Sequence, residues 1–134
     1  MSTKHSISAI LLLMLMAVAT AREPGYILKI TDIEGTTTLV TRASSSSSSS
    51  CNSPDFPVLR GGDRKDIDFR ELRWITVLHD KPASDADFYI DVELTLKDGS
   101  IEKYEMIKNI RFTGKAGDED FSIEVKDINT VQIQ

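Results

Sequence analysis

Apolar and polar side chains alternate along several short stretches of this chain. In residues 88–96 every second residue is apolar, and most of the residues between them are polar. A period of two is typical of a strand with one buried face. The turn Asp98-Gly99 and a second alternating stretch at 101–107 follow, and glycine takes the positive φ that a tight hairpin requires. Residues 26–41, with Glu34-Gly35 at their centre, repeat this order, so the pattern predicts two β-hairpins.

Another repeated pattern relates residues 67–77 to residues 123–133 at an offset of 56 positions. Apolar residues coincide at five positions, acidic residues at two and basic residues at one. The shared order is a short alternating stretch, a polar turn (Arg70-Glu71 or Lys126-Asp127) and a second short stretch. The apolar spacing of residues 66–78 alone fits a helix or a strand, but the alignment predicts strand, turn and strand.

The alignment extends over most of each half of the chain. Leu59-Arg60-Gly61 parallels Phe112-Thr113-Gly114, and the two hairpins also correspond. Two similar β units therefore span about residues 25–78 and 88–133. Neither unit can bury its apolar face alone. We expect an all-β fold, a single small barrel or sandwich of about 8–10 short antiparallel strands built from these two units.

The first residues have the order of a secretory signal peptide. Lys4 lies in a short polar start, residues 7–19 are almost wholly apolar, and Ala19-Thr20-Ala21 is a small-x-small cleavage site. The alternative, a membrane anchor, needs about 20 apolar residues, and this run is shorter. We expect cleavage near Ala21 to remove residues 1–21. Residues 22–134 then form one exported domain, periplasmic or secreted, that is soluble and not inserted in a membrane.

A serine-rich tract interrupts the first unit. Seven serines, Ser44 to Ser50, are followed by Cys51-Asn52-Ser53-Pro54. Such a tract has no apolar surface to offset the entropy of ordering, so we expect a mobile loop at 44–54. Cys51 cannot form an internal disulfide because the chain has no second cysteine. It is an incidental loop residue, a thiol for intermolecular pairing or a reactive thiol.

The charge balance restricts the class of partner. The chain has a net charge of −5, and loss of the signal, which contains Lys4 and no acidic residue, changes this to −6. An acidic surface argues against nucleic acid and anionic membranes as partners. We expect a protein or an envelope polymer instead, or self-association of the chain through its edge strands.

Carboxylates in two expected loops give a candidate calcium site. They are Asp85, Asp87, Asp118 and Asp120. Oxygen ligands from the two loops could meet at one end of the domain and hold Ca²⁺. The alternative is that they are solvated turn residues that keep strand edges apart. No other cofactor is expected, because one histidine and one cysteine after Ala21 are too few for a structural zinc site.

The sequence contains no complete catalytic set of residues. His79-Asp80 could combine a general base with a carboxylate, but adjacent residues of an extended segment point to opposite sides. No Gly-x-Ser-x-Gly turn supplies a nucleophile. The basic, glycine-rich segment 60–65 lacks the Gly-Lys-Ser/Thr of a phosphate loop, which favours a plain turn between strands. The sequence therefore favours a protein without catalytic residues.

Trp74 departs from the alignment of the two units, because Thr130 stands at the corresponding position. With its neighbour Arg73 it could form a binding patch, since tryptophan and arginine are enriched among residues that dominate binding. It could equally fill the centre of the barrel, and alternation alone does not decide between these roles. Tyr89, on the polar face of its strand with Asp91, is a further candidate for ligand binding.

Three segments of the second unit carry a resemblance to known proteins. They are Leu-Thr-Leu-Lys-Asp-Gly-Ser at 94–100, Ile-Arg-Phe-Thr-Gly-Lys at 110–115 and Ile-Glu-Val-Lys-Asp-Ile at 123–128. These strand and turn signatures resemble small β-barrel-like domains of uncharacterised bacterial exported or envelope proteins. The resemblance implies a β-barrel-like module and brings no activity and no site residues.

Three functions are open on the sequence alone. The favoured one is a non-catalytic exported β domain that binds a macromolecule of the cell envelope or exterior. The second is a calcium-binding or carboxylate-based hydrolase or its accessory protein. The third is a structural envelope component that associates with itself. The first is favoured because export and paired β units are indicated, whereas each catalytic set lacks a member.

Overall fold

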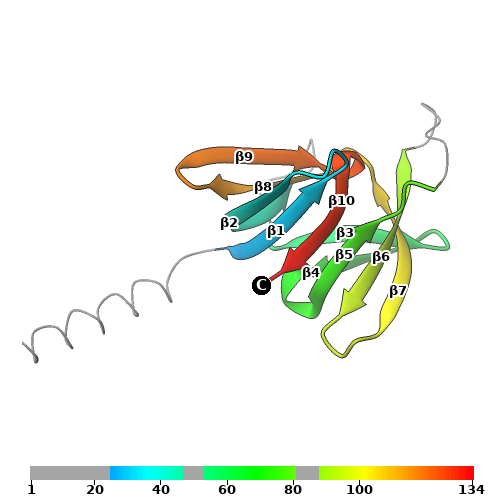
Figure 1. Ribbon diagram of the computed structural model, residues 1–134. Coiled ribbons are helices and arrows are strands. Elements are labelled where there is room, and N and C mark those ends of the chain that lie inside the picture. The colour runs from blue at the N-terminus through cyan, green and yellow to red at the C-terminus, as the bar shows by residue number, and fades with distance from the viewer. Residues whose placement is uncertain (1–24, 47–52, 81–87) are drawn as a thin grey trace, which may run out of the picture.

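The computed structural model describes residues 25–46, 53–80 and 88–134, which form an all-β domain. Ten strands make one antiparallel sheet that curls strongly into a half-barrel (Figure 1). The elements are β1 Tyr26–Asp32, β2 Thr37–Ser46, β3 Asp55–Arg60, β4 Asp63–Asp68, the 3₁₀ turn η1 Phe69–Glu71, β5 Leu72–Val77, β6 Tyr89–Leu96, β7 Ile101–Ile107, β8 Arg111–Ala116, β9 Glu119–Glu124, the 3₁₀ turn η2 Val125–Asp127 and β10 Ile128–Ile133. The expected all-β fold is confirmed, as one curled sheet. Within the described ranges, no helix is long and apolar enough to cross a bilayer.

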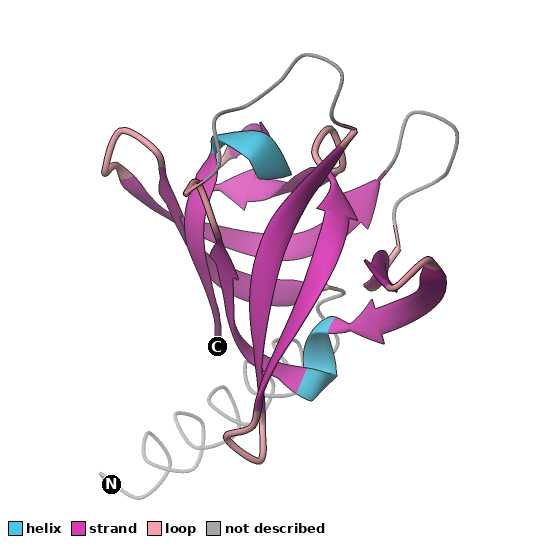
Figure 2. Cartoon of the chain, turned by 90° about the vertical axis from the view of Figure 1, so that its right-hand side faces the viewer, coloured by secondary structure: helices cyan, strands magenta, loops and turns pink. Residues whose placement is uncertain are grey.

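The strand order of the sheet is unchanged when its two halves are exchanged. The order is β4-β3-β7-β6-β5-β10-β1-β2-β8-β9. If each of β1–β5 is replaced by the strand five numbers later, and each of β6–β10 by the strand five numbers earlier, the same order results when it is read from the opposite edge of the sheet. The bounds of β3, β4, η1 and β5 are each 56 residues before those of β8, β9, η2 and β10. The strand order and the element bounds of the two halves therefore correspond, with β5 and β10 adjacent at the centre of the sheet. Figure 2 shows the two 3₁₀ turns at opposite ends of the sheet.

The β1–β2 and β6–β7 hairpins correspond at a second offset. Asp32 N–H closes the first turn with a backbone hydrogen bond of 3.0 Å, and Leu96 N–H closes the second with one of 2.8 Å. Gly35 and Gly99 have φ values of 89° and 91° at matching positions of the two turns. Residues of the two hairpins are thus related by an offset of 64 positions.

Gly61 and Gly114, which the sequence alignment paired, occupy different kinds of position. Gly61 lies in the β3–β4 turn with φ 59°, and its counterpart in the β8–β9 turn is Gly117 with φ 65°. Gly114 lies inside β8, where a Cβ atom would be 2.5 Å from Val40 Cγ1 and from Thr41 O. The expected pairing is wrong because Gly114 permits close packing of β8 on β2, whereas Gly61 permits a turn.

The start of the serine tract belongs to the sheet. Ser44 to Ser46 form the end of β2, which corrects the expectation of a loop from residue 44. They are ordered because β8 pairs with them on one side, and Ser53 pairs with Ser45 on the other through two backbone hydrogen bonds of 2.8 Å. This bridge holds the segment before β3 beside the end of β2. Residues 47–52, with Cys51, and residues 1–24, with the expected signal peptide, lie outside the described residues.

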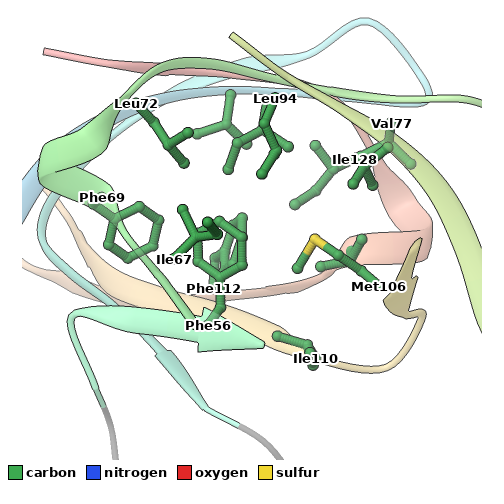
Figure 3. Packing of buried hydrophobic residues seen from close by; sticks show 14 of the residues in the cluster. Phe56, Ile67, Phe69, Leu72, Val77, Leu94, Met106, Ile110, Phe112 and Ile128 are labelled. Atoms are coloured by element: carbon green, nitrogen blue, oxygen red, sulfur yellow. The ribbon is translucent and has the colours of Figure 1, made fainter. Parts of the chain in front are cut away.

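Aromatic rings fill one end of the core. Phe56, Phe69 and Phe112 are at most 1% exposed, and their ring centroids lie 5.4 to 5.6 Å apart in tilted or edge-to-face contacts. Tyr26 joins them, with its ring 5.5 Å from that of Phe69. The labelled side chains on the other side of the core, such as Met106 and Ile128, are not aromatic (Figure 3). The two ends of the domain therefore differ in their packing although their backbones correspond.

Asp68 fixes the η1 turn next to this aromatic cluster. Its carboxylate accepts hydrogen bonds from Arg70 N–H at 2.8 Å and from the Tyr26 hydroxyl at 3.1 Å, and Glu71 accepts one from Asp68 N–H at 3.2 Å. These contacts form a capping box. Burial alone raises the pKa of the Asp68 carboxyl, but the hydrogen bonds from Arg70 and Tyr26 outweigh burial and hold this pKa below its usual range. Glu124, the counterpart before η2, makes no side-chain cap.

Replacing Phe69 tests the aromatic cluster. We expect Phe69→Ala to lower the free energy of unfolding by about 3–5 kcal/mol, because it leaves a cavity among packed rings. The control is Phe88→Ala, at a residue that is 74% exposed, and its effect should stay within about 0.5 kcal/mol. Urea denaturation of both variants measures the difference. Equal losses would contradict the packing described.

Replacing Asp68 tests the capping box by its pH dependence. Because the folded-state pKa is lowered, the ionised carboxylate stabilises the fold above the unfolded-state pKa of about 4. This stabilisation is lost as the pH falls through the lower, folded-state pKa. Asp68→Asn should therefore be less stable than the wild type at neutral pH, and the gap should narrow on acidification. Urea denaturation across this pH window measures the difference in free energy of unfolding between the two proteins. A difference that does not change with pH would contradict the role given to the Asp68 carboxylate.

Candidate functional site

A β-bulge at the start of β5 turns two neighbouring side chains outward. The register with β6 shifts between Leu72 and Trp74, so that Arg73 is an extra residue in β5. Leu72 and Ile75 are both buried, and Arg73 and Trp74 between them are both exposed. Trp74 is 40% exposed, so the alternative that it fills the core is wrong. Strict alternation could not place it, because the bulge interrupts the alternation at this point.

The same bulge occurs in β10 with different side chains. Its register with β1 skips Asn129, between Ile128 and Thr130. Asn129 and Thr130 therefore take the positions that Arg73 and Trp74 take in β5. The backbone forms the bulge equally well with small polar residues, so the fold itself requires neither the arginine nor the tryptophan.

Trp74 lies in a row of residues that crosses the outer face of the sheet. The strand registers place its members side by side, in the order Leu39, Lys29, Gln132, Trp74, Thr95 and Ile101. Neighbouring strands are about 4.8 Å apart. Leu39 and Ile101 are 55% and 63% exposed, so the row has an apolar residue at each end and polar residues on both sides of Trp74. We call this set the Trp74 row.

A second row runs beside the first, two residues away along each strand. Its members in order are Thr37, Thr31, Thr130, Thr76, Glu93 and Lys103. The hydroxyl oxygens of Thr31 and Thr37 are 2.9 Å apart, and Lys103 Nζ lies 4.0 Å from Glu93 Oε1. The two rows thus place hydroxyl groups, the Gln132 amide and the Glu93 carboxylate at positions neighbouring Trp74 on the outer face.

A hollow of about 310 Å³ lies next to the bulge, at the end of the sheet that carries η1. Its lining residues are Tyr26, Arg70, Leu72, Arg73, Lys97, Ile133 and Gln134. Three of them are cationic, and they come from η1, from β5 and from the β6–β7 turn. We call this feature the basic hollow. It adjoins the Trp74 row, because Arg73 precedes Trp74 in the bulge.

The cations of the basic hollow differ in their partners. Arg70 Nη2 lies 3.2 Å from Asp68 Oδ2. Arg73 and Lys97 form no salt bridge with any residue that the structure describes. Asp98 lies in the neighbouring turn, and its pKa is lowered chiefly by a hydrogen bond from Ser100, with a smaller contribution from Arg73. Arg73 and Lys97 are therefore the two cations of the hollow without a salt bridge in the described part of the chain, and Arg73 interacts electrostatically with Asp98.

The structure brings two of the three proposed binding residues together and leaves the third apart. Arg73 and Trp74 are adjacent on the outer face. Tyr89 is 46% exposed, but it lies at the far end of β6 from Thr95, the strand partner of Trp74. Six residues of strand separate Tyr89 from Thr95, a distance of about 20 Å. Tyr89 is therefore not part of the same site.

The carboxylates proposed for calcium are only partly covered by the structure. Asp85 and Asp87 lie outside the described residues. Asp118 is in the β8–β9 turn, and Asp120 pairs with Lys115, whose hydrogen bond lowers the pKa of the Asp120 carboxyl. Among the residues that are described, no group of three or more His, Cys, Asp or Glu side chains is placed to hold a metal ion. The calcium site stays a prediction.

The other candidates from the sequence have structural roles where they are described. His79 Nε2 lies 2.7 Å from the carbonyl oxygen of Ile128, which ties the end of β5 to the start of β10. The segment 60–65 forms the β3–β4 hairpin, with Gly61 and Gly62 both at positive φ in its turn. Neither His79 nor the segment 60–65 lines the basic hollow.

Lys97, Gln132 and Gln134 were missed as candidates from the sequence. Each adjoins Trp74 or Arg73 only through pairing between distant strands, which a linear pattern does not show. One signal could have found Lys97. Its counterpart in the other hairpin is Ile33, so Lys97 breaks the correspondence of the two units as Trp74 does.

Comparison with known proteins assigns a family and no activity. A search of curated proteins finds no match to this chain. A family model described as "Uncharacterised protein" matches residues 27–134, which include every strand except the first residue of β1. The chain therefore belongs to this family of uncharacterised proteins.

Proposed function

We propose that this chain is an exported, non-catalytic binding domain that holds a macromolecule of the cell envelope or exterior against the Trp74 row and the basic hollow. The observation that carries the proposal is the outward placement of Trp74 and Arg73 together on the β5 bulge. At the matching bulge of β10 the fold uses Asn129 and Thr130. Since the fold forms this bulge without tryptophan or arginine, Trp74 and Arg73 are candidates for a functional role.

The chemistry of Trp74 supports a binding role. Trp74 is 40% exposed, so part of its large apolar surface is accessible to a partner. Tryptophan and arginine also recur at the centres of binding sites, where they contribute most of the affinity. The Trp74 row extends over six strands of the sheet, and such a surface suits an extended ligand better than a small molecule.

Self-association through edge strands has weaker support. The edges of the sheet are β4 and β9, and their sequences Asp-Arg-Lys-Asp-Ile-Asp and Glu-Asp-Phe-Ser-Ile-Glu are rich in charge. Charged side chains on an edge strand oppose its pairing with another chain. A partner other than a second copy is therefore the better proposal.

Export can be tested on the chain as cells produce it. We expect the protein recovered from outside the cytoplasm to begin at Arg22, because cleavage after Ala19-Thr20-Ala21 removes the apolar segment. Mass spectrometry of the intact protein measures its N-terminus. Recovery of the whole uncleaved chain in the cytoplasm would be the opposite result. It would exclude a macromolecule of the cell envelope or exterior as the binding partner.

Binding can be tested by retention on the insoluble envelope and extracellular polymer fraction of the source cells. The double variant Trp74→Thr, Arg73→Asn introduces the residue types that occupy the matching positions of the β10 bulge, so its fold should be preserved. We expect it to bind at least about tenfold more weakly than the wild type, the effect of losing two central contacts. Tyr89→Ala, a matched exposed aromatic on the same sheet, should bind as the wild type does.

Two outcomes of this experiment would contradict the proposed site. One is equal retention of the wild type and the double variant. The other is a loss of retention in Tyr89→Ala as large as that in the double variant, since Tyr89 lies about 20 Å from the site. Circular dichroism of each variant verifies that a loss of retention is not a loss of fold.

A further inference from the structure

The basic hollow concentrates positive charge in a chain whose net charge is −5. Arg70, Arg73 and Lys97 reach it from separate segments and line a single concavity. Like charges in one concave place repel each other, and a bound anion relieves that repulsion. Among the described residues, Arg70 has a salt bridge with Asp68, and Arg73 interacts electrostatically with Asp98 without a salt bridge. The lining that the structure describes contains three cations and no Asp or Glu side chain, so the hollow is suited to an anionic group.

The corresponding elements of the two halves supply an internal comparison for this charge. At the opposite end of the sheet, Ile33 N–H donates to the last residue of η2 at 2.9 Å, as Lys97 N–H donates to the last residue of η1 at 3.0 Å. The counterparts of Arg70, Arg73 and Lys97 there are Lys126, Asn129 and Ile33. The η2 end therefore forms the same backbone hydrogen bond with a single cation, Lys126, at these three positions. The extra charge is not a requirement of the fold.

The surroundings of the hollow favour a sugar as the carrier of the anion. Trp74 offers a flat indole surface on which the C–H face of a sugar ring can stack. Gln132 and Thr95, its partners on the neighbouring strands, supply amide and hydroxyl groups that match sugar hydroxyls. Arg73, next to Trp74, can bind a carboxylate through two parallel hydrogen bonds.

We infer that the basic hollow and Trp74 bind the acidic sugar units of a polyuronate, a polysaccharide whose rings carry carboxylates. The inference rests on the proposed function and names the polymer class for that site. The carboxylate lies between Arg73 and Lys97, and the ring stacks on Trp74. A nucleic acid is a poorer fit, because a continuous positive groove with several stacking aromatics binds single strands. The Trp74 row has a single aromatic residue, and its only cation is Lys29.

Oligogalacturonate is the direct probe, and its methyl ester is the matched neutral ligand. Trp74 is the only tryptophan of the chain, so its fluorescence reports on this site alone. We expect oligogalacturonate to change the emission saturably. The methyl ester should bind at least about tenfold more weakly, because it cannot form charge-assisted hydrogen bonds. Isothermal titration calorimetry gives the same affinities without relying on the tryptophan.

Variants that copy the opposite end of the sheet test the cations. Arg73→Asn and Lys97→Ile, which insert the counterpart residues, should each weaken binding of oligogalacturonate by about tenfold. Lys126→Gln is the control, because it removes one positive charge at the far end of the domain. It should leave the affinity unchanged, and thermal melts of all three verify that they fold.

The inference is overturned if the methyl ester binds as tightly as the acid or if Lys126→Gln weakens binding as much as Lys97→Ile. Equal affinity for inorganic polyphosphate overturns the assignment to sugars, since that ligand has no ring to stack. A further outcome separates this inference from the proposed function. If Trp74→Thr, Arg73→Asn loses retention on the envelope fraction but oligogalacturonate does not bind the wild type, the polyuronate is wrong and the binding site stands.

Discussion

The antiparallel pairing of β5 with β10 is the contact on which the rest of the domain depends. These strands end the two halves of the chain and lie side by side at the centre of the sheet, with Val131 opposite Ile75 on the core side and Gln132 opposite Trp74 on the outer side. The strand orders on the two sides of this pair correspond, so that each element of one half has a counterpart in the other. The pairing also decides which residues share the outer face, and hence the composition of the Trp74 row.

The bulge next to that pairing links the core to the surface. An extra residue in a strand increases its local twist and bends it, which helps the sheet curl around the core cluster. The same extra residue allows Leu72 and Ile75 to be buried while Arg73 and Trp74 both face solvent. The geometry that closes the apolar core therefore also presents the candidate binding residues.

Much of this fold could be predicted from local patterns, and much of the site could not. The β6–β7 hairpin and the strand-turn-strand order of residues 66–78 follow from alternation, turn glycines and the internal alignment. The bulge has no such signature, since a period of two predicts either face for Trp74. The alignment paired Gly114 with Gly61, because the close packing of two strands that Gly114 permits is a property of tertiary structure and not of the local sequence. Lys97 lines the same hollow as Arg73 only because β6 pairs with β5.

The differences between the two halves gather at one end of the domain. Phe69 stands there where Val125 stands at the other end, and the Asp68 capping box has no equivalent at Glu124. These two features make η1 a firmly packed and capped turn, and η1 supplies one wall of the basic hollow. A binding site on fixed elements loses less conformational entropy when it takes up a ligand than one on loops. The aromatic core and the capping box, which first serve stability, thus also hold Arg70 and its neighbours in place for the proposed anionic ligand.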